Sequence, residues 1–277
     1  MWIRMKQRVM TGALLSLTAL VLLWIGGVVL GVAAAAMVGV GVWEEFRALK
    51  QAGHRPVMWP TWAAVVLSVP LGLMGGPRAV LPLVIGACLL TLGCELLSAK
   101  PTVEETSVSL LPLLTVFLPG MCVISLIGTV PRQLQWTLLT LTVAVPCIGD
   151  IFAMQVGRRL GGPKLCPDVS PNKTISGAIG GLCGSLITAI LVGVCAAILC
   201  RSEARALLPA WWEYLTLGLI GGAASQLGDL CFSLIKRHSG IKDYSNLFPG
   251  HGGMLDRLDS ILFMALVVFS YYLLACL

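Results

Sequence analysis

Long apolar stretches separated by short polar segments follow one another along the whole chain. Nine of them are candidate membrane spans: 9–25, 28–47, 58–75, 79–97, 106–127, 133–155, 175–200, 211–234 and 256–277. A helix needs about 20 apolar residues to cross the hydrocarbon core of a bilayer, and within lipid a helix satisfies its own backbone hydrogen bonds. The pattern therefore predicts an all-α integral membrane protein with about nine transmembrane helices. The break between the first two spans rests on Gly26 and Gly27, which in one long segment would instead form a kink.

The composition excludes a water-soluble globule, since 57% of the residues are hydrophobic and only 12% are charged. A soluble domain carries about 25% charged residues. The N-terminus resembles a signal peptide, but its apolar run continues well past the usual length of about 7–15 residues, so an uncleaved first span is predicted. The ten cysteines lie mostly in apolar runs without a C-x-x-C pair, which favours buried hydrophobic side chains over disulfides or zinc.

The distribution of Lys and Arg predicts the orientation. With nine spans and a cytoplasmic N-terminus, only four of the 19 basic residues lie outside: Arg78, Arg132, Arg201 and Arg205. Because basic residues concentrate on the cytoplasmic side of membrane proteins, we expect the C-terminus outside and the polar loops 156–174 and 235–255 in the cytoplasm. The net charge of +6 follows from this asymmetry, and nucleic-acid binding is not expected because no soluble domain carries a basic stripe.

Acidic residues mark the second half of the chain, which contains all six aspartates. Asp150 and Asp229 lie inside predicted spans, where a charge costs about 2.5–3.5 kcal/mol and indicates a functional site or an interior salt bridge. Asp256 and Asp259 stand three residues apart at the start of the last span, just before its apolar run, on one helix face. They suit either capping of that helix or, together with Asp229, a Mg²⁺ site. Acids near span ends are predicted to lie at the membrane interface: Glu44, Glu45, Glu95, Glu104 and Glu105.

The first cytoplasmic loop, 156–174, ends in Ser170-Pro-Asn-Lys173-Thr174 directly before the seventh span. Thr174 is predicted to cap that helix, which leaves Lys173 beside a helix N-terminus, a position that attracts anions. Lysines at membrane edges also bind lipid headgroups, so the motif alone is weak evidence.

The second loop, 235–255, contains a glycine-rich turn. Gly252 and Gly253 allow positive φ at little cost, and with Gly250 they let backbone N–H groups approach a phosphate. His251 is suited to donate to a phosphate or to orient a metal-bound water, although a lone histidine is more often structural. Further cations flank the turn: Lys236, Arg237, Lys242 and Arg257. Together the two loops predict a site for a polyphosphate and a divalent ion.

The second loop also resembles a family signature. Residues 236–259 read K-R-x4-K-D followed by P-G-H-G-G-[hydrophobic]-x-D-R-[hydrophobic]-D, as in the phosphatidate cytidylyltransferases, or CDP-diacylglycerol synthases. Segments 170–174 and 228–229 resemble family elements as well. The resemblance covers 150–277, whereas the first 145 residues match mainly as hydrophobic spans. At 150–154 the family's aromatic residue is missing.

This resemblance implies that CTP and phosphatidic acid react to CDP-diacylglycerol and pyrophosphate at the cytoplasmic face of the inner cell membrane. It implies Mg²⁺, leaves open a second monovalent or divalent cation, and implies a homodimer. Residues 1–130 would form scaffold or dimerisation helices, and 131–277 the catalytic region. The implied catalytic residues are Asp229, Asp256, Lys173, Arg257 and His251. The implied metal ligands are Asp229 and Asp256 first, then Asp150 and Asp259. The implied substrate contacts are Ser170, Lys173, Thr174, Lys236, Arg237, Lys242, Asp243, Gly250, Gly252 and Gly253.

Two other functions remain open at this point. A secondary transporter would also place aspartates within the membrane, although the acids gather at one end and no inverted repeat is evident. A related cytidylyltransferase would act on an isoprenoid-ether phosphatidic acid instead. A CDP-alcohol phosphatidyltransferase is disfavoured because its D-G-x-x-A-R…G-x-x-x-D-x-x-x-D run is absent.

Overall fold

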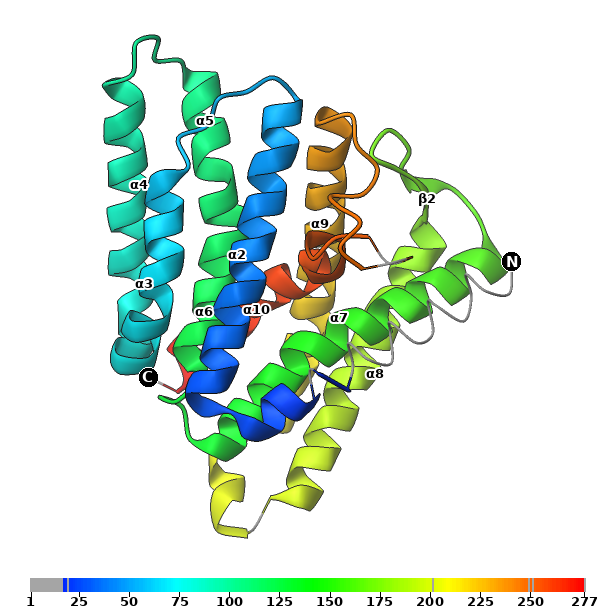
Figure 1. Cartoon of the computed structure of the whole chain (residues 1–277). Helices are drawn as coiled ribbons and strands as arrows, with labels where there is room; N and C mark the ends of the chain where they lie inside the picture. Colours follow the sequence, from blue (N-terminus) through cyan, green and yellow to red (C-terminus); the bar gives the residue numbers. More distant parts are fainter. Residues whose placement is uncertain (1–16, 19, 201, 249, 251, 277) are drawn as a thin grey trace. The chain divides into compact units, whose positions relative to one another are not determined.

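The computed structural model describes residues 17–18, 20–200, 202–248, 250 and 252–276 (Figure 1). In that part the chain is helical apart from one β-hairpin and the connecting turns. The elements are α2 (Gly27–Gln51), α3 (Trp59–Gly75), η1 (Gly76–Ala79), α4 (Val80–Leu96), α5 (Val103–Pro112), η2 (Leu113–Phe117), α6 (Leu118–Leu126), α7 (Arg132–Leu160), β1 (Lys164–Cys166), β2 (Ser170–Thr174), α8 (Ile175–Leu199), η3 (Ser202–Leu207), α9 (Trp211–His238) and α10 (Leu255–Ala275).

The helical membrane architecture agrees with the sequence. Among the described residues, seven stretches are long and apolar enough to cross a membrane. One of them, Trp59–Leu96, contains both α3 and α4, which η1 joins and which pack against each other, as the third and fourth predicted spans require (Figure 1). Gly26 has a φ of 67° and interrupts the helix before α2, so the predicted break is present. Most of the first predicted span lies outside the described residues, and the count of nine and the orientation of the termini stay predictions.

The chain forms two compact units. Unit 1 comprises residues 1–129 and 235–258, and so includes α2 to α6 and the connection from the end of α9 to the start of α10. Unit 2 comprises residues 130–234 and 259–277, and so includes α7, the hairpin, α8, most of α9 and most of α10.

Glycines allow the helices within each unit to approach closely, as is common in membrane proteins. In unit 2, a Cβ on Gly180 would lie 2.5 Å from Val156, and one on Gly184 would lie 2.6 Å from Phe152. These two glycines are four residues apart, so one face of α8 accommodates the side chains of α7. In unit 1, a Cβ on Gly120 would lie 2.2 Å from a methyl group of Val38.

Three acids of unit 1 are buried inside the protein and hydrogen-bonded there. Glu44 and Glu45 of α2 are completely buried, and Glu95 of α4 is 3% exposed, so these side chains do not face solvent. That they lie at the depth of the membrane interface stays a prediction. Partners on other segments satisfy them: Thr115 donates to both oxygens of Glu45, and Ser109 donates to Glu95. A buried carboxylate is tolerated where such donors replace water.

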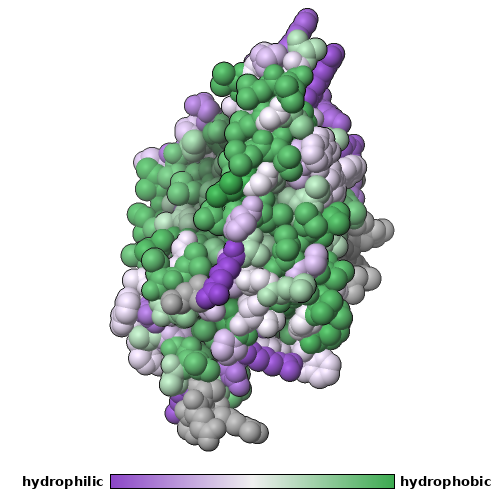
Figure 2. Space-filling view, turned by 90° about the vertical axis from the view of Figure 1, so that its left-hand side faces the viewer, coloured by the Kyte–Doolittle hydropathy of each residue, from purple (hydrophilic) through white to green (hydrophobic). Residues whose placement is uncertain are grey.

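The outer faces of α3 and α4 are apolar. Hydrophobic residues dominate the face drawn in Figure 2, which is the side on which these two helices lie in Figure 1. Val66, Leu81 and Leu89 are among the exposed hydrophobic residues of the two helices. Side chains of this kind suit contact with lipid acyl chains.

Candidate functional site

The connection between α9 and α10 forms a closed loop in unit 1. Two backbone hydrogen bonds end α9. The N–H of Ile241 donates to the carbonyl of Lys236, and the N–H of Gly240 donates to the carbonyl of Arg237, with Gly240 at a φ of 66°. This is the Schellman arrangement, in which a left-handed glycine terminates a helix. Farther along, the N–H of Phe248 donates to the carbonyl of Gly252 at 2.9 Å, which closes the glycine turn.

Asp256 organises this loop. One of its oxygens accepts from the ammonium group of Lys236 at 2.8 Å, and the other accepts from the backbone N–H groups of Tyr244 and Gly253, both at 2.9 Å. The side chains of Lys236 and Asp256 are only 12% and 4% exposed. The ammonium group also lies 5.6 Å from the centre of the Tyr244 ring. Asp256 therefore connects the last turn of α9, the middle of the loop and the first turn of α10.

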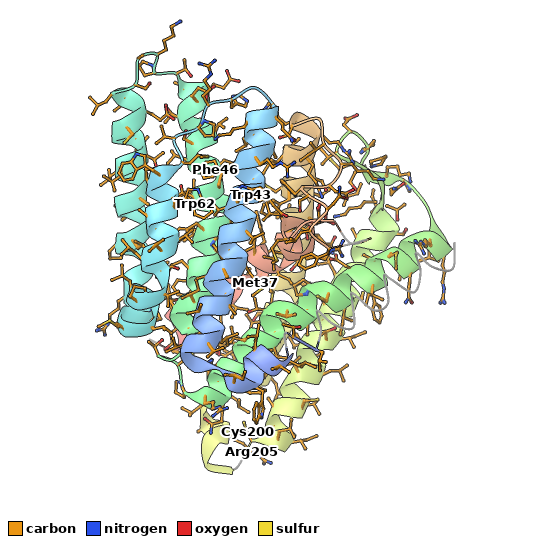
Figure 3. The ribbon with its side chains drawn as sticks, viewed as in Figure 1. Met37, Trp43, Phe46, Trp62, Cys200 and Arg205 are labelled. Atoms are coloured by element: carbon orange, nitrogen blue, oxygen red, sulfur yellow. The ribbon has the colours of Figure 1, made fainter. Side chains whose placement is uncertain are left out.

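The carboxylate of Glu44 supports the same loop from α2. It accepts hydrogen bonds from the backbone N–H groups of Met254 and Leu255 and from the hydroxyl of Ser245. The labelled neighbours Trp43 and Phe46 locate this part of α2 in Figure 3. Sequence reasoning missed this contact, because no local pattern connects Glu44 with residues about 200 positions farther along the chain.

The glycines of the loop have two different roles. Gly250 and Gly252 have φ values of 77° and 82°, so both use the left-handed conformation that glycine allows. Gly253 is not in that region. Its missing side chain instead makes room for Glu44, since a Cβ on Gly253 would lie 2.5 Å from a carboxylate oxygen.

Two histidines join the end of α9 to other parts of unit 1. His238 and His54 face each other with a distance of 3.1 Å between their Nε2 atoms. The other ring nitrogen of His54 lies 3.3 Å from Glu105, which also accepts from the backbone N–H of Arg55. This chain of contacts links the basic last turn of α9, through His54, to the N-terminal part of α5.

The first polar loop contains structure that the sequence did not predict. Helix α7 continues to Leu160, and strands β1 and β2 form an antiparallel hairpin, with Lys164 paired to Thr174. The hydroxyl of Thr174 accepts from the N–H of Gly177 at 3.1 Å, which confirms it as the cap of α8. The hydroxyl of Ser176 donates to the carbonyl of Gly161 and joins the start of α8 to the end of α7.

A second polar cluster lies in unit 2 around Lys173. Its ammonium group forms an ion pair with Asp229 of α9. Asp150 of α7 is close enough to interact electrostatically with both residues, and it accepts a hydrogen bond from the hydroxyl of Ser260 at 3.2 Å. Asp259 accepts from the N–H of Ser260 at 2.8 Å. Residues from α7, β2, α9 and α10 thus meet in one place, and two of the four predicted metal ligands, Asp150 and Asp229, are neighbours.

The predicted residues are distributed over both clusters. Lys236, Gly252, Gly253 and Asp256 belong to the unit 1 loop, whereas Asp150, Lys173, Asp229 and Asp259 belong to unit 2. That Asp229 and Asp256 share one ion stays a prediction, because each belongs to a different unit. Four further predicted residues are exposed or partly exposed without a contact that assigns a role: Ser170, Lys242, Asp243 and Gly250. Arg237 and Arg257 are exposed at the ends of α9 and α10, and His251 lies outside the described residues.

The donor atoms of the unit 2 cluster fit a hard cation. Carboxylate and hydroxyl oxygens are the ligands that Mg²⁺ prefers, and it commonly uses one or two carboxylates with phosphates and water. Asp150 and Asp229 place two carboxyl groups beside the single ammonium group of Lys173. Both oxygens of Asp256, in contrast, already accept hydrogen bonds within the loop. Among the described residues, no group of three or more His, Cys, Asp or Glu side chains converges as a ready metal site.

Comparison with known proteins identifies the family. The model of the cytidylyltransferase family matches residues 6–275. The chain belongs to the cytidylyltransferase family. The match confirms the resemblance inferred from the loop between α9 and α10. It also extends that resemblance through the first 145 residues, where the sequence analysis found little more than apolar spans.

Bacterial phosphatidate cytidylyltransferases are similar to this chain, two of them over nearly their whole length. The phosphatidate cytidylyltransferase of Bacillus subtilis (strain 168) is 33% identical over 282 residues, which cover 98% of this chain and 98% of the relative. That of Brucella abortus biovar 1 (strain 9-941) is 31% identical over 271 residues, which cover 96% of this chain and 93% of the relative. That of Synechocystis sp. (strain ATCC 27184 / PCC 6803 / Kazusa) is 39% identical over 148 residues, or 52% of this chain and 46% of the relative.

Proposed function

We propose that this protein transfers the cytidylyl group of CTP to phosphatidic acid, giving CDP-diacylglycerol and pyrophosphate. The family supports the transfer of a cytidylyl group, and relatives that are similar over nearly the full chain are named phosphatidate cytidylyltransferases. The apolar helices fit an enzyme whose lipid substrate resides in the bilayer.

One observation carries the proposal: the signature segment folds into a closed loop at the ends of two apolar helices. Its glycine turn, its basic residues and the buried pair of Lys236 and Asp256 are adjacent within unit 1. Turns of this kind present backbone N–H groups to phosphates, and Arg and Lys side chains supply charge-assisted hydrogen bonds. This combination suits the triphosphate of a nucleotide.

The chemistry needs charge neutralisation more than a general base. The phosphate of phosphatidic acid is largely dianionic near pH 7, and one of its oxygens attacks the α-phosphorus of CTP. The bond to the β-phosphate breaks, and pyrophosphate leaves with the electron pair. The protein must therefore bring two anions together and stabilise the charge that develops on the leaving group. We assign this role to Lys173, Lys236, Arg237, Lys242 and Arg257, with His251 as a further phosphate contact.

We propose Mg²⁺ as the cofactor, with Asp229, Asp256, Asp150 and Asp259 as the candidate ligands. The proximity of Asp150 and Asp229 within unit 2 supports these two residues as ligands. When bound, the ion would neutralise phosphate oxygens and stabilise the leaving pyrophosphate. Lys173 holds the carboxylate of Asp229 in place, and the hydroxyl of Ser260 does so for Asp150.

We also propose the setting of the enzyme. The asymmetry of basic residues supports a cytoplasmic N-terminus, an external C-terminus and an active site at the cytoplasmic face of the inner membrane. Residues 1–130 would then provide the scaffold of a homodimer, and 131–277 the catalytic region.

The test is product formation by the purified protein. Labelled CTP and phosphatidic acid should give a labelled CDP-lipid, and removal of divalent ions with EDTA should abolish the reaction until Mg²⁺ is restored. A parallel reaction with an isoprenoid-ether phosphatidic acid distinguishes the two lipid classes. Failure to form any CDP-lipid would refute the proposal, and activity that survives EDTA would refute the metal requirement.

Two lysines of the hairpin provide a matched pair of variants. Lys173→Ala should lower turnover by about 10²-fold or more, because preorganised charges of this kind stabilise the transition state. Lys164→Ala, which removes an exposed lysine of the same hairpin, should leave turnover nearly unchanged. Equal activity of the two variants would assign Lys173 to headgroup binding instead.

A further inference from the structure

Glu44 is a buried carboxylate that contacts the signature loop from a distant helix. It lies in α2 and has no exposed surface. Its oxygens lie 3.0 Å from the N–H of Met254 and 2.8 Å from that of Leu255, and the hydroxyl of Ser245 donates to one of them. All of these residues belong to unit 1.

These contacts replace an ordinary helix cap. The first N–H groups of a helix have no partner within it, and a side chain just before the helix usually accepts from them. Before α10 this position is occupied by Gly253 and Met254, neither of which has an oxygen in its side chain. The carboxylate of Glu44 takes this role, and its negative charge is favourable at the positive end of the helix dipole.

Gly253 and Glu44 are matched to each other. A Cβ on Gly253 would lie 2.5 to 2.8 Å from three atoms of the Glu44 carboxylate group. The backbone of Gly253 lies outside the left-handed region, so this proximity rather than its conformation accounts for the glycine.

Two carboxylates hold the loop between them. Asp256 accepts hydrogen bonds from the backbone N–H groups of Tyr244 and Gly253. Glu44 accepts from the residue that follows each of these, through the hydroxyl of Ser245 and the N–H of Met254. The two sides of the loop are thus each fixed at consecutive positions. Removal of either carboxylate would release both sides at once.

We infer that Glu44 is a positioning residue that keeps the loop 239–255 in the conformation that binds the nucleotide. Among the described residues, the side chain of Glu44 accepts hydrogen bonds from Ser245, Met254 and Leu255, so it acts through the loop. This inference rests on the proposed function, since it assigns the nucleotide phosphates to this loop. If the loop adopts its nucleotide-binding conformation only for a fraction of the time, the apparent dissociation constant increases by the inverse of that fraction. Glu44 therefore governs the KM for CTP, and the rate at saturating CTP does not depend on it.

The matched variants are Glu44→Gln and Glu45→Gln. Glu45 is the next residue, is equally buried and bonds to Thr115 rather than to the loop. Glu44→Gln should raise the KM for CTP about tenfold or more and leave kcat within about twofold of the original value. The reason is that one amide oxygen cannot accept from all three donors, while the NH₂ group of the glutamine would face backbone N–H groups. Glu45→Gln should leave the KM for CTP within about twofold of the original.

Other outcomes would overturn the inference. A loss of kcat at unchanged KM would indicate fewer folded molecules, and an equal rise in KM for Glu45→Gln would indicate a general effect on α2. If Glu44→Gln is not recovered in folded form, Glu44→Asp provides the same KM test, since it keeps the charge but falls short by one methylene.

Hydrogen exchange tests the positioning role without using the activity. In Glu44→Gln, a peptide that contains Met254 and Leu255 should exchange faster than in the original protein, because both N–H groups lose their acceptor. The same peptide should be unchanged in Glu45→Gln. Unchanged exchange in Glu44→Gln would refute the inference, whereas an inactive original protein with faster exchange in the variant would refute only the proposed function.

A double substitution tests the fit between Glu44 and Gly253. Gly253→Ala should raise the KM for CTP by itself, because the new methyl group displaces the carboxylate. In a Glu44→Ala background the same change meets open space, so the double variant should be no worse than Glu44→Ala alone. Independent, multiplying effects of the two changes would contradict the proposed fit.

Discussion

The buried pair of Lys236 and Asp256 should make a measurable contribution to stability. Asp256→Asn removes the charge opposite the ammonium group of Lys236, whose side chain is only 12% exposed. One amide oxygen must then serve donors that two oxygens served before. Removal of one partner of a buried ion pair costs about 3–5 kcal/mol. We expect about 3–4 kcal/mol for this variant, near the lower end of that range, since the ammonium group retains some exposure to water.

The two substitutions at this pair should not be additive. Lys236→Met should cost less, about 2–3 kcal/mol, because the carboxylate keeps two N–H donors. In the Asp256→Asn background no counter-charge is left to lose, so the double variant should be about as stable as Asp256→Asn alone. The measurement is the free energy of unfolding in SDS and detergent mixtures, followed by tryptophan fluorescence. A double variant that is destabilised by the sum of the two single effects would refute the coupling.

Three further predictions address the membrane region. Asp229→Asn should abolish most CDP-lipid synthesis without loss of membrane insertion. Asp168→Asn should leave this activity nearly unchanged, because Asp168 lies in an exposed turn. Comparable activity of the two variants would show that Asp229 is not part of the active site. Single cysteines that replace Leu165 and Asn246, in a variant without the native cysteines, should react with a membrane-impermeant maleimide only from the cytoplasmic side. Labelling of these cysteines from outside intact cells would refute the predicted orientation. Gly228→Ala should lower the free energy of unfolding by about 1–3 kcal/mol, because its Cβ would lie 2.5 Å from a carbonyl oxygen of α10.

Gly86→Ala is the control for the glycine prediction. A Cβ at Gly86 meets no atom within 4 Å, and alanine favours a helix. This variant should be as stable as the original or slightly more so in the same unfolding assay. A similar loss of stability in both variants would show that the effect does not come from the packing of α9 against α10.

The sequence by itself determined the features that depend on local composition. Apolar runs of sufficient length predicted the helices, because the cost of placing polar backbone in lipid leaves few alternatives. Thr174 was recognised as a cap from its position before an apolar run, and Gly252 as a turn residue from its neighbours. The signature at 236–259 identified the family, since its residues are close together in the chain.

Only the tertiary structure decided how distant residues satisfy one another. Glu44 reads as one of two adjacent acids at a helix end, and nothing in its neighbourhood indicates that it caps a helix more than 200 residues later. The need for glycine at position 253 could not be predicted from the sequence either, because the atoms that leave no room for a side chain belong to α2. Asp256 likewise has the spacing of a metal ligand, while its partners in the fold are Lys236 and two amides of the loop. Local patterns record where a side chain is placed along a helix, whereas the hydrogen-bond partner of a buried charge depends on which segments fold together.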